Sequence, residues 1–147
     1  MQEFFDSILA NHVLLVSLSA WFIAQLIKVL IDLVAFHRLD LKRLTGAGGM
    51  PSSHTALATA LAFSVGKAAG WDSVIFAVAG VVAGIVMYDA AGVRRAAGKQ
   101  AEAINQIIGD VYRGKQISQD RLKELIGHTP FEVLVGALLG VFIAAIF

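Results

Sequence analysis

The sequence contains no cysteine and only two prolines among its 147 residues. The absence of cysteine excludes a disulfide, a thiolate metal site and a cysteine nucleophile. Charged residues are also scarce, at 16%, while 57% of the residues are hydrophobic. Soluble domains are about half apolar and about a quarter charged, so this balance indicates a membrane protein. A chain of this length is expected to form one domain, residues 1–147.

Lysine and arginine are absent from the first 27 residues, where Glu3 and Asp6 give the chain a negative charge. A signal peptide needs a basic N-terminal region, so the first apolar run is interpreted as a retained membrane span. The sequence also lacks internal repeats and low-complexity tracts. It has no basic surface interleaved with aromatic residues, so we expect no nucleic-acid partner.

Four apolar segments are expected to cross the membrane, because a spanning helix needs about 20 mostly apolar residues. They cover residues 12–36, 53–70, 73–91 and 130–147. The second segment is rich in alanine and other small residues, which predicts a buried helix that packs closely against its neighbours. The predicted fold is therefore all-α, an integral membrane bundle of about four helices. A bundle this small has little interior, which favours a homo-oligomer.

Basic residues gather in two connecting segments, 37–43 and 92–127. The positive-inside rule then predicts a multi-pass protein of the inner cell membrane, with both segments cytoplasmic and both termini outside. Lys99 to Val111 has isoleucines on one stripe and is predicted to form an amphipathic helix, and "ISQDRLKELIGH" (117–128) predicts a shorter one. Together they would form a cytoplasmic helical hairpin between the third and fourth spans.

The stretch "GGMPSSHTA" is the most polar and flexible turn of the chain, and it leads directly into the second span. Gly48 and Gly49 allow the backbone to approach a ligand closely. Pro51 suits a first helical turn, and Ser52 or Ser53 can cap it. The N–H groups and the dipole of that helix start favour an anion, phosphate above all. The alternative is an ordinary helix-entry turn.

Ionisable residues from all four predicted spans lie at the cytoplasmic end, and such residues within or near spans are candidate functional residues. They are His54, Asp89, Arg94, Arg95, His128 and Glu132, with Lys28 and Asp32 in the cytoplasmic half of the first span.

In "GHTPFE", Glu132 follows His128 by four residues and lies on the same helical face. A carboxylate beside an imidazole can fix its tautomer and support positive charge on it, which makes the histidine a useful nucleophile or base. Pro130 lies between them and can distort this turn. The alternative is a surface histidine beside a carboxylate that favours the helix dipole.

The segment "YDAAGVRRAAGKQAEAINQ" supplies a third cluster. Arg94 and Arg95 can clamp phosphate oxygens with bidentate geometry, or they can simply anchor the span end. Asp89 can orient an arginine or the substrate, or bind a metal. Lys28 and Asp32, four residues apart, can instead neutralise each other. A metal site built from Asp89 and the histidines matches no standard spacing, so we expect no metal and no cofactor.

Three segments together resemble the divergent branch of the type 2 phosphatidic acid phosphatase and vanadium haloperoxidase superfamily. They are "GGMPSSH", "MYDAAGVRRAAGKQAE" and "IGHTPFEVLVGALLG". "GGMPSSHTA" is similar to the superfamily's Pro-Ser-Gly-His motif, and "GHTPFE" to its final His-x-x-x-Asp. The resemblance implies a metal-independent phosphatase in which His128 is the nucleophile, Glu132 orients it, and His54 is the general acid and base.

Under the same resemblance, Ser52 and Ser53 match phosphate-contacting positions, and lysine and arginine hold the phosphate. The sequence departs from the superfamily at several positions. Lys-x6-Arg-Pro has no match, which leaves Lys28 and Arg43 as candidates without its spacing. Leu122 stands where the last motif has arginine, so Arg121, or Arg94 and Arg95, must replace it.

The sequence thus predicts a lipid phosphate phosphatase at the cytoplasmic membrane face, acting on phosphatidylglycerophosphate or phosphatidic acid through a phosphohistidine. The alternative is a non-catalytic phospholipid-binding or transport protein that keeps the phosphate cradle.

Overall fold

The computed structural model describes residues 1–37, 49–111 and 128–147. Within these ranges every regular element is a helix. The helices are α1 (Gln2–Leu9), α2 (His12–Phe36), α3 (Ser53–Ala69), α4 (Val74–Ala91), α5 (Val93–Val111) and α6 (Pro130–Ile146). All four segments predicted as spans are therefore helices, with bounds within one residue of the prediction.

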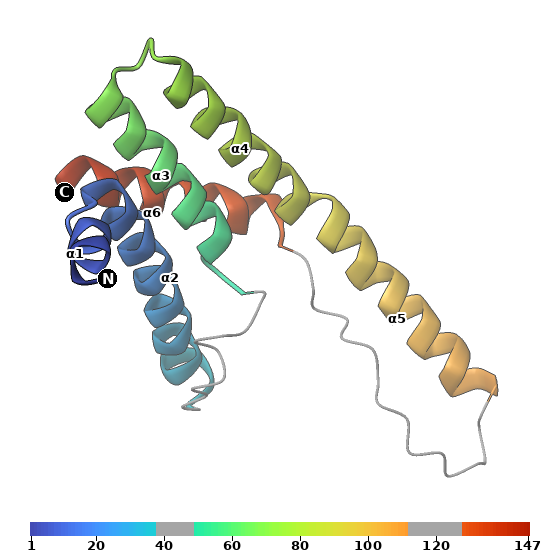
Figure 1. Cartoon of the computed structure of the whole chain (residues 1–147). Helices are drawn as coiled ribbons and strands as arrows, with labels where there is room; N and C mark the ends of the chain where they lie inside the picture. The colour runs from blue at the N-terminus through green and yellow to red at the C-terminus, as the bar shows by residue number, and fades with distance from the viewer. Residues whose placement is uncertain (38–48, 112–127) are drawn as a thin grey trace.

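Helix α3 occupies the centre of the bundle and contacts α2, α4 and α6 (Figure 1). Its buried positions carry only small side chains, namely Ser53, Thr55, Ala56, Ala58, Ala60, Ala62, Ser64 and Gly66. Small side chains allow helix backbones to approach closely where there is no water to drive association. This composition explains how one 17-residue helix can be enclosed by three others.

Helix α6 meets α3 through two glycines one turn apart. A Cβ at Gly136 would lie 2.5 Å from the carbonyl oxygen of Ser52. A Cβ at Gly140 would collide with Thr59 Oγ1 and with the carbonyl oxygen of Ala56. The Thr59 hydroxyl also donates to the carbonyl of Ala137 at 3.3 Å, so the interface combines close packing with a hydrogen bond between helices.

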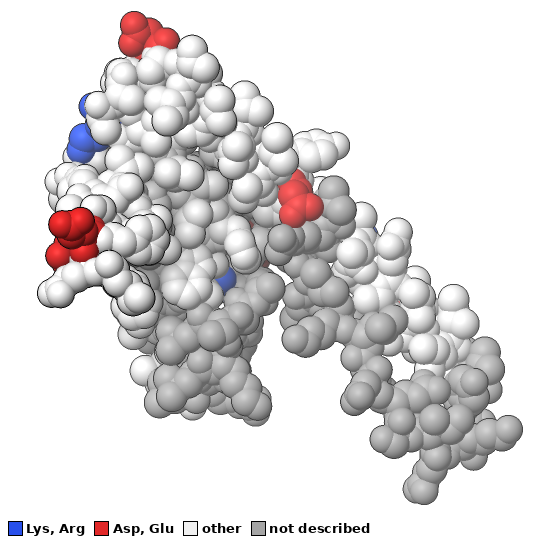
Figure 2. Space-filling view, in the orientation of Figure 1, with Lys and Arg blue, Asp and Glu red and all other residues white. Residues whose placement is uncertain are grey.

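The outward faces of the helices are apolar. Val74 is 81% exposed, and other large aliphatic side chains of α4 are also exposed, including Val78, Val81 and Ile85. Figure 2 shows charged side chains as a few isolated spots on an otherwise uncharged face of the described residues. A continuous apolar surface of this kind suits contact with lipid.

Two helical stretches of the described residues are long and apolar enough to cross a membrane, His12–Ala35 and Val74–Gly109. Pro130–Ile146 is apolar but shorter.

Two features differ from the prediction. The N-terminal helix α1 was not expected. Helix α5 begins at Val93 rather than Lys99, and it directly follows α4 and extends away from the bundle (Figure 1). Its alanine, arginine and glutamate residues are good helix formers, and one interior glycine, Gly98, costs only about 1 kcal/mol. The second helix predicted for the hairpin, 117–128, lies almost entirely outside the described residues.

We expect Gly140→Ala to lower the apparent melting temperature of the purified protein in detergent, because the backbone carbonyl of Ala56 cannot move aside. Overpacking of this kind costs about 1–3 kcal/mol. Gly84→Ala is the matched control, since its added Cβ would meet nothing within 4 Å. Equal melting temperatures for the two variants would contradict the close α3–α6 packing.

Candidate active site

The first turn of α6 is closed by a reciprocal capping box. Thr129 is the N-cap residue, and its Oγ1 accepts from the backbone N–H of Glu132 at 3.3 Å. Glu132 Oε2 in turn accepts from the backbone N–H of Thr129 at 3.0 Å. Pro130, the first helical residue, fits because its missing N–H would have no partner there. The sequence pattern Thr-x-x-Glu carries this signal, although Thr129 was not singled out.

The same carboxylate oxygen also contacts the imidazole of His128. The distance from His128 Nδ1 to Glu132 Oε2 is 3.1 Å, so Pro130 does not separate the pair. His128 is buried, with 3% of its side chain exposed, whereas Glu132 keeps 23% exposed. A carboxylate held by the capping box can accept from Nδ1–H, and this favours the tautomer in which Nε2 carries no proton.

Two backbone hydrogen bonds join the helix ends around this pair. The N–H of Ser52, directly before α3, donates to the carbonyl of Glu132 at 3.2 Å. The N–H of His128 donates to the carbonyl of Ala90, in the last turn of α4, at 3.1 Å. The start of α3, the end of α4 and the start of α6 are therefore held together at one end of the bundle.

Ser52 caps α3, so the helix begins at Ser53 and Pro51 lies outside it, not in its first turn as the sequence suggested. Ser52 is fully buried, and its Oγ accepts from the N–H of Thr55 at 3.4 Å and lies 2.9 Å from the Thr55 hydroxyl. Gly49 precedes this turn with a φ of 79°, a conformation that favours glycine. The Ser52 hydroxyl is thus engaged within the protein.

Lys28 is a buried cation that lies against the start of α3. Only 3% of its surface is exposed, and its Nζ donates to Ser53 Oγ at 3.2 Å. This bond joins the middle of α2 to the first turn of α3. Asp32 lies one turn further along α2 and is half-buried.

A pocket of about 240 Å³ lies between α3, α4 and α6. It is lined by His54, Ile85, Val86, Asp89, Ala90 and His128. The structure therefore brings His54, Asp89 and His128, which are up to 74 residues apart in the sequence, to one cavity. The N-termini of α3 and α6 also meet here, and two helix N-termini favour a bound anion.

The remaining predicted residues are less fully described. Arg94 and Arg95 lie in the first turn of α5, directly after α4, but their side chains lie outside the described residues. Gly48, Arg43 and Arg121 also lie outside them.

Within the described part of the chain, no group of three or more histidine, aspartate or glutamate side chains is arranged to hold a metal ion. The apolar wall of the pocket, Ile85 and Val86, carried no signal in the sequence.

We expect Ser52→Ala to destabilise the protein even without a ligand, because an N-cap contributes about 0.5–2 kcal/mol and the buried Thr55 hydroxyl would lose its partner. Thermal unfolding in detergent measures the loss. Ser19→Ala, at an exposed position of α2, is the control. If both variants melted at the wild-type temperature, the capping role of Ser52 would be wrong.

Comparisons with known proteins identify the family of the chain. A family model, described as the Divergent PAP2 family, matches residues 9–143. The chain is 43% identical, over a 150-residue alignment that covers 95% of each protein, to the uncharacterized membrane protein YuiD of Bacillus subtilis (strain 168). No solved structure matches the chain. Because the family model covers nearly all of the sequence, this membrane protein belongs to the Divergent PAP2 family.

Proposed function

We propose that the protein is a phosphatase that hydrolyses a phosphomonoester of a membrane lipid. The observation that carries the proposal is that His54 and His128 line one pocket, with Glu132 in direct contact with the ring of His128. An oriented nucleophile, a second proton-transfer group and an anion-binding helix start are the parts that phosphoryl transfer through histidine requires.

In the first step, His128 Nε2 attacks phosphorus while the bond from phosphorus to the lipid oxygen breaks. His54 gives its proton to that oxygen, and the lipid alcohol leaves. In the second step, His54 takes a proton from water, the water oxygen attacks phosphorus, and the phosphorus–nitrogen bond breaks. Inorganic phosphate is released and both histidines return to their starting states. Glu132 stabilises the positive charge on His128 in both steps.

The phosphate would be held by the backbone at the starts of α3 and α6 and by nearby cations. We assign clamping to Arg94 and Arg95, since α5 starts directly after the pocket wall. Gly48, Gly49, Arg43 and Arg121 remain candidates from the sequence. Lys28 and Ser53 would support the phosphate site from the interior of the bundle, because their hydrogen bond lies at the first turn of α3, which also carries His54. Asp89 would orient one of the arginines or the substrate.

Four helices, α2, α3, α4 and α6, would cross the inner cell membrane, with both termini outside. The basic segments 37–43 and 92–127 follow α2 and α4 in the sequence, and α4 ends beside the pocket, so the positive-inside rule would make the pocket end cytoplasmic. A phosphomonoester of the inner leaflet fits this position. Phosphatidylglycerophosphate is our first choice because it is made on that face, and phosphatidic acid is the second.

The missing Lys-x6-Arg-Pro motif favours a second candidate, a phospholipid-binding or transport protein without catalysis. The contact between His128 and Glu132 favours the enzyme, because binding alone does not need an oriented imidazole.

The small interior of the bundle also favours a homo-oligomer, and crosslinking in membranes that gave only monomer would contradict it.

We expect purified protein to release phosphate from at least one of these lipids in the presence of EDTA. His54→Ala should lower the rate by about 10²–10⁴-fold, the contribution of a positioned general acid and base. His128→Ala removes the nucleophile and should lower the rate at least as far. His37→Asn is the matched control, because His37 is exposed at the end of α2 with a φ of 50°, which asparagine tolerates. Lipid binding without release by a folded protein would favour the second candidate.

Glu132→Gln separates catalysis from folding. Glutamine can keep the capping box, so the melting temperature should stay near that of the wild type, while the loss of charge beside His128 should lower the rate. Wild-type activity in this variant would contradict the role given to the carboxylate.

A further inference from the structure

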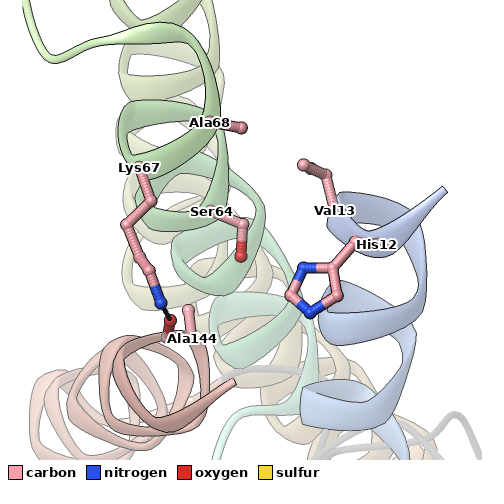
Figure 3. Close-up of a pocket in the computed structure, with 6 residues that line it drawn as sticks. All are labelled: His12, Val13, Ser64, Lys67, Ala68 and Ala144. Carbon is pink, nitrogen blue, oxygen red and sulfur yellow. Dashed lines mark hydrogen bonds between the residues drawn. The ribbon is translucent and has the colours of Figure 1, made fainter.

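A second pocket lies at the opposite end of the bundle, where α2 begins and α3 and α6 end. It has a volume of about 180 Å³ and is lined by His12, Val13, Ser64, Lys67, Ala68 and Ala144 (Figure 3). A water molecule occupies about 30 Å³ in the liquid, so the pocket has room for a group larger than one water. Neither the family relationship nor the phosphatase proposal gives this pocket a role.

Lys67 brings a positive charge to the pocket. Its Nζ donates to the carbonyl oxygen of Ala144 at 2.9 Å and lies 3.5 Å from that of Ala145, in the last turn of α6. These contacts hold the ammonium at the pocket wall and offset the negative end of the α6 dipole. An ammonium has three N–H donors, so Lys67 keeps at least one for a ligand.

Ser64 and His12 supply further donors. Ser64 is only 5% exposed, and its hydroxyl points into the space between α2, α3 and α6, as does the ring of His12 (Figure 3). Among the described residues, neither the Ser64 hydroxyl nor the His12 ring has a hydrogen-bond partner. A ligand in the pocket would give this hydroxyl a hydrogen-bond partner.

The start of α2 adds a positive electrostatic contribution at the same pocket. His12 is the first residue of this 25-residue helix, and the Asn11 side chain accepts only from the N–H of Leu14. The positive end of the α2 dipole and the first-turn N–H groups therefore lie beside the pocket. None of the six lining residues is acidic.

We propose that this pocket binds a phosphate group, with Lys67, His12 and Ser64 as donors. The full charge of Lys67, the three donor side chains and the N-terminus of α2 favour an anion, because together they outweigh the C-terminal ends of α3 and α6, which carry only about half a negative charge each. The pocket lies at the ends of apolar helices, which is where a phospholipid headgroup would lie against membrane-spanning helices. Ser64 follows His54 by ten residues along α3, about 15 Å of helix, so this site is separate from the His54–His128 pocket.

Histidine-selective NMR tests the proposal with a readout at the site itself. The chain has four histidines, and the His12 ring signal is identified by its loss in His12→Asn. Orthophosphate and a short-chain phosphatidylglycerol are titrated separately at constant pH. We expect a saturable shift of the His12 signal with at least one probe. A response to the lipid alone identifies a headgroup site, and a response to orthophosphate shows that a free phosphate group is sufficient.

Lys67→Gln and Ser64→Ala should each weaken the apparent affinity by about tenfold, the value of one hydrogen bond to a charged group. Glutamine can still donate to the α6 carbonyls, and the other three histidine signals report whether each variant folds. Lys99→Gln, at an exposed position of α5, should leave the titration unchanged. No shift with either probe, or an unchanged affinity in both folded pocket variants, would overturn the proposal. These results do not depend on phosphatase activity.

Discussion

Two backbone hydrogen bonds, from Ser52 to Glu132 and from His128 to Ala90, determine the geometry of the candidate active site. They connect the start of α3, the end of α4 and the start of α6. Glu132 can then satisfy the Thr129 N–H and contact the His128 ring with a single oxygen. The residues at the ends of these helices thus bring the candidate catalytic side chains together. This close meeting of backbones depends in turn on Gly136 and Gly140, which present no side chain to α3.

The helices that build the bundle could be predicted from hydropathy alone, because each apolar run is bounded by a polar or glycine-containing turn. The start of α5 could not, since the isoleucine stripe that predicted this helix lies after Lys99, whereas good helix formers before it extend the helix back to Val93. Helix α1 has only eight residues, and a helix this short is marginal without the contact that it makes with α2. Local helix propensity decides the first case, and the contact with α2 decides the second.

At the candidate site, the sequence could predict the contacts between residues that are one helical turn apart. The contact between His128 and Glu132 follows from their separation of four residues. The bond from Lys28 to Ser53 joins residues 25 apart, and no local pattern in the sequence contains it. Likewise, either serine of the Ser-Ser pair could have been the cap, and only the structure shows that Ser52 caps α3 while Ser53 accepts from Lys28.

The central claim is that His128 becomes phosphorylated in a pocket that it shares with His54. Its most direct test uses the His54→Ala variant and a radiolabelled aryl phosphate, whose leaving group needs no protonation. Rapid quenching should trap an acid-labile, base-stable label on the peptide that contains His128, because attack remains possible while hydrolysis of the intermediate is slowed. Absence of label, or label that persists after His128→Ala is added to the same variant, would contradict the claim.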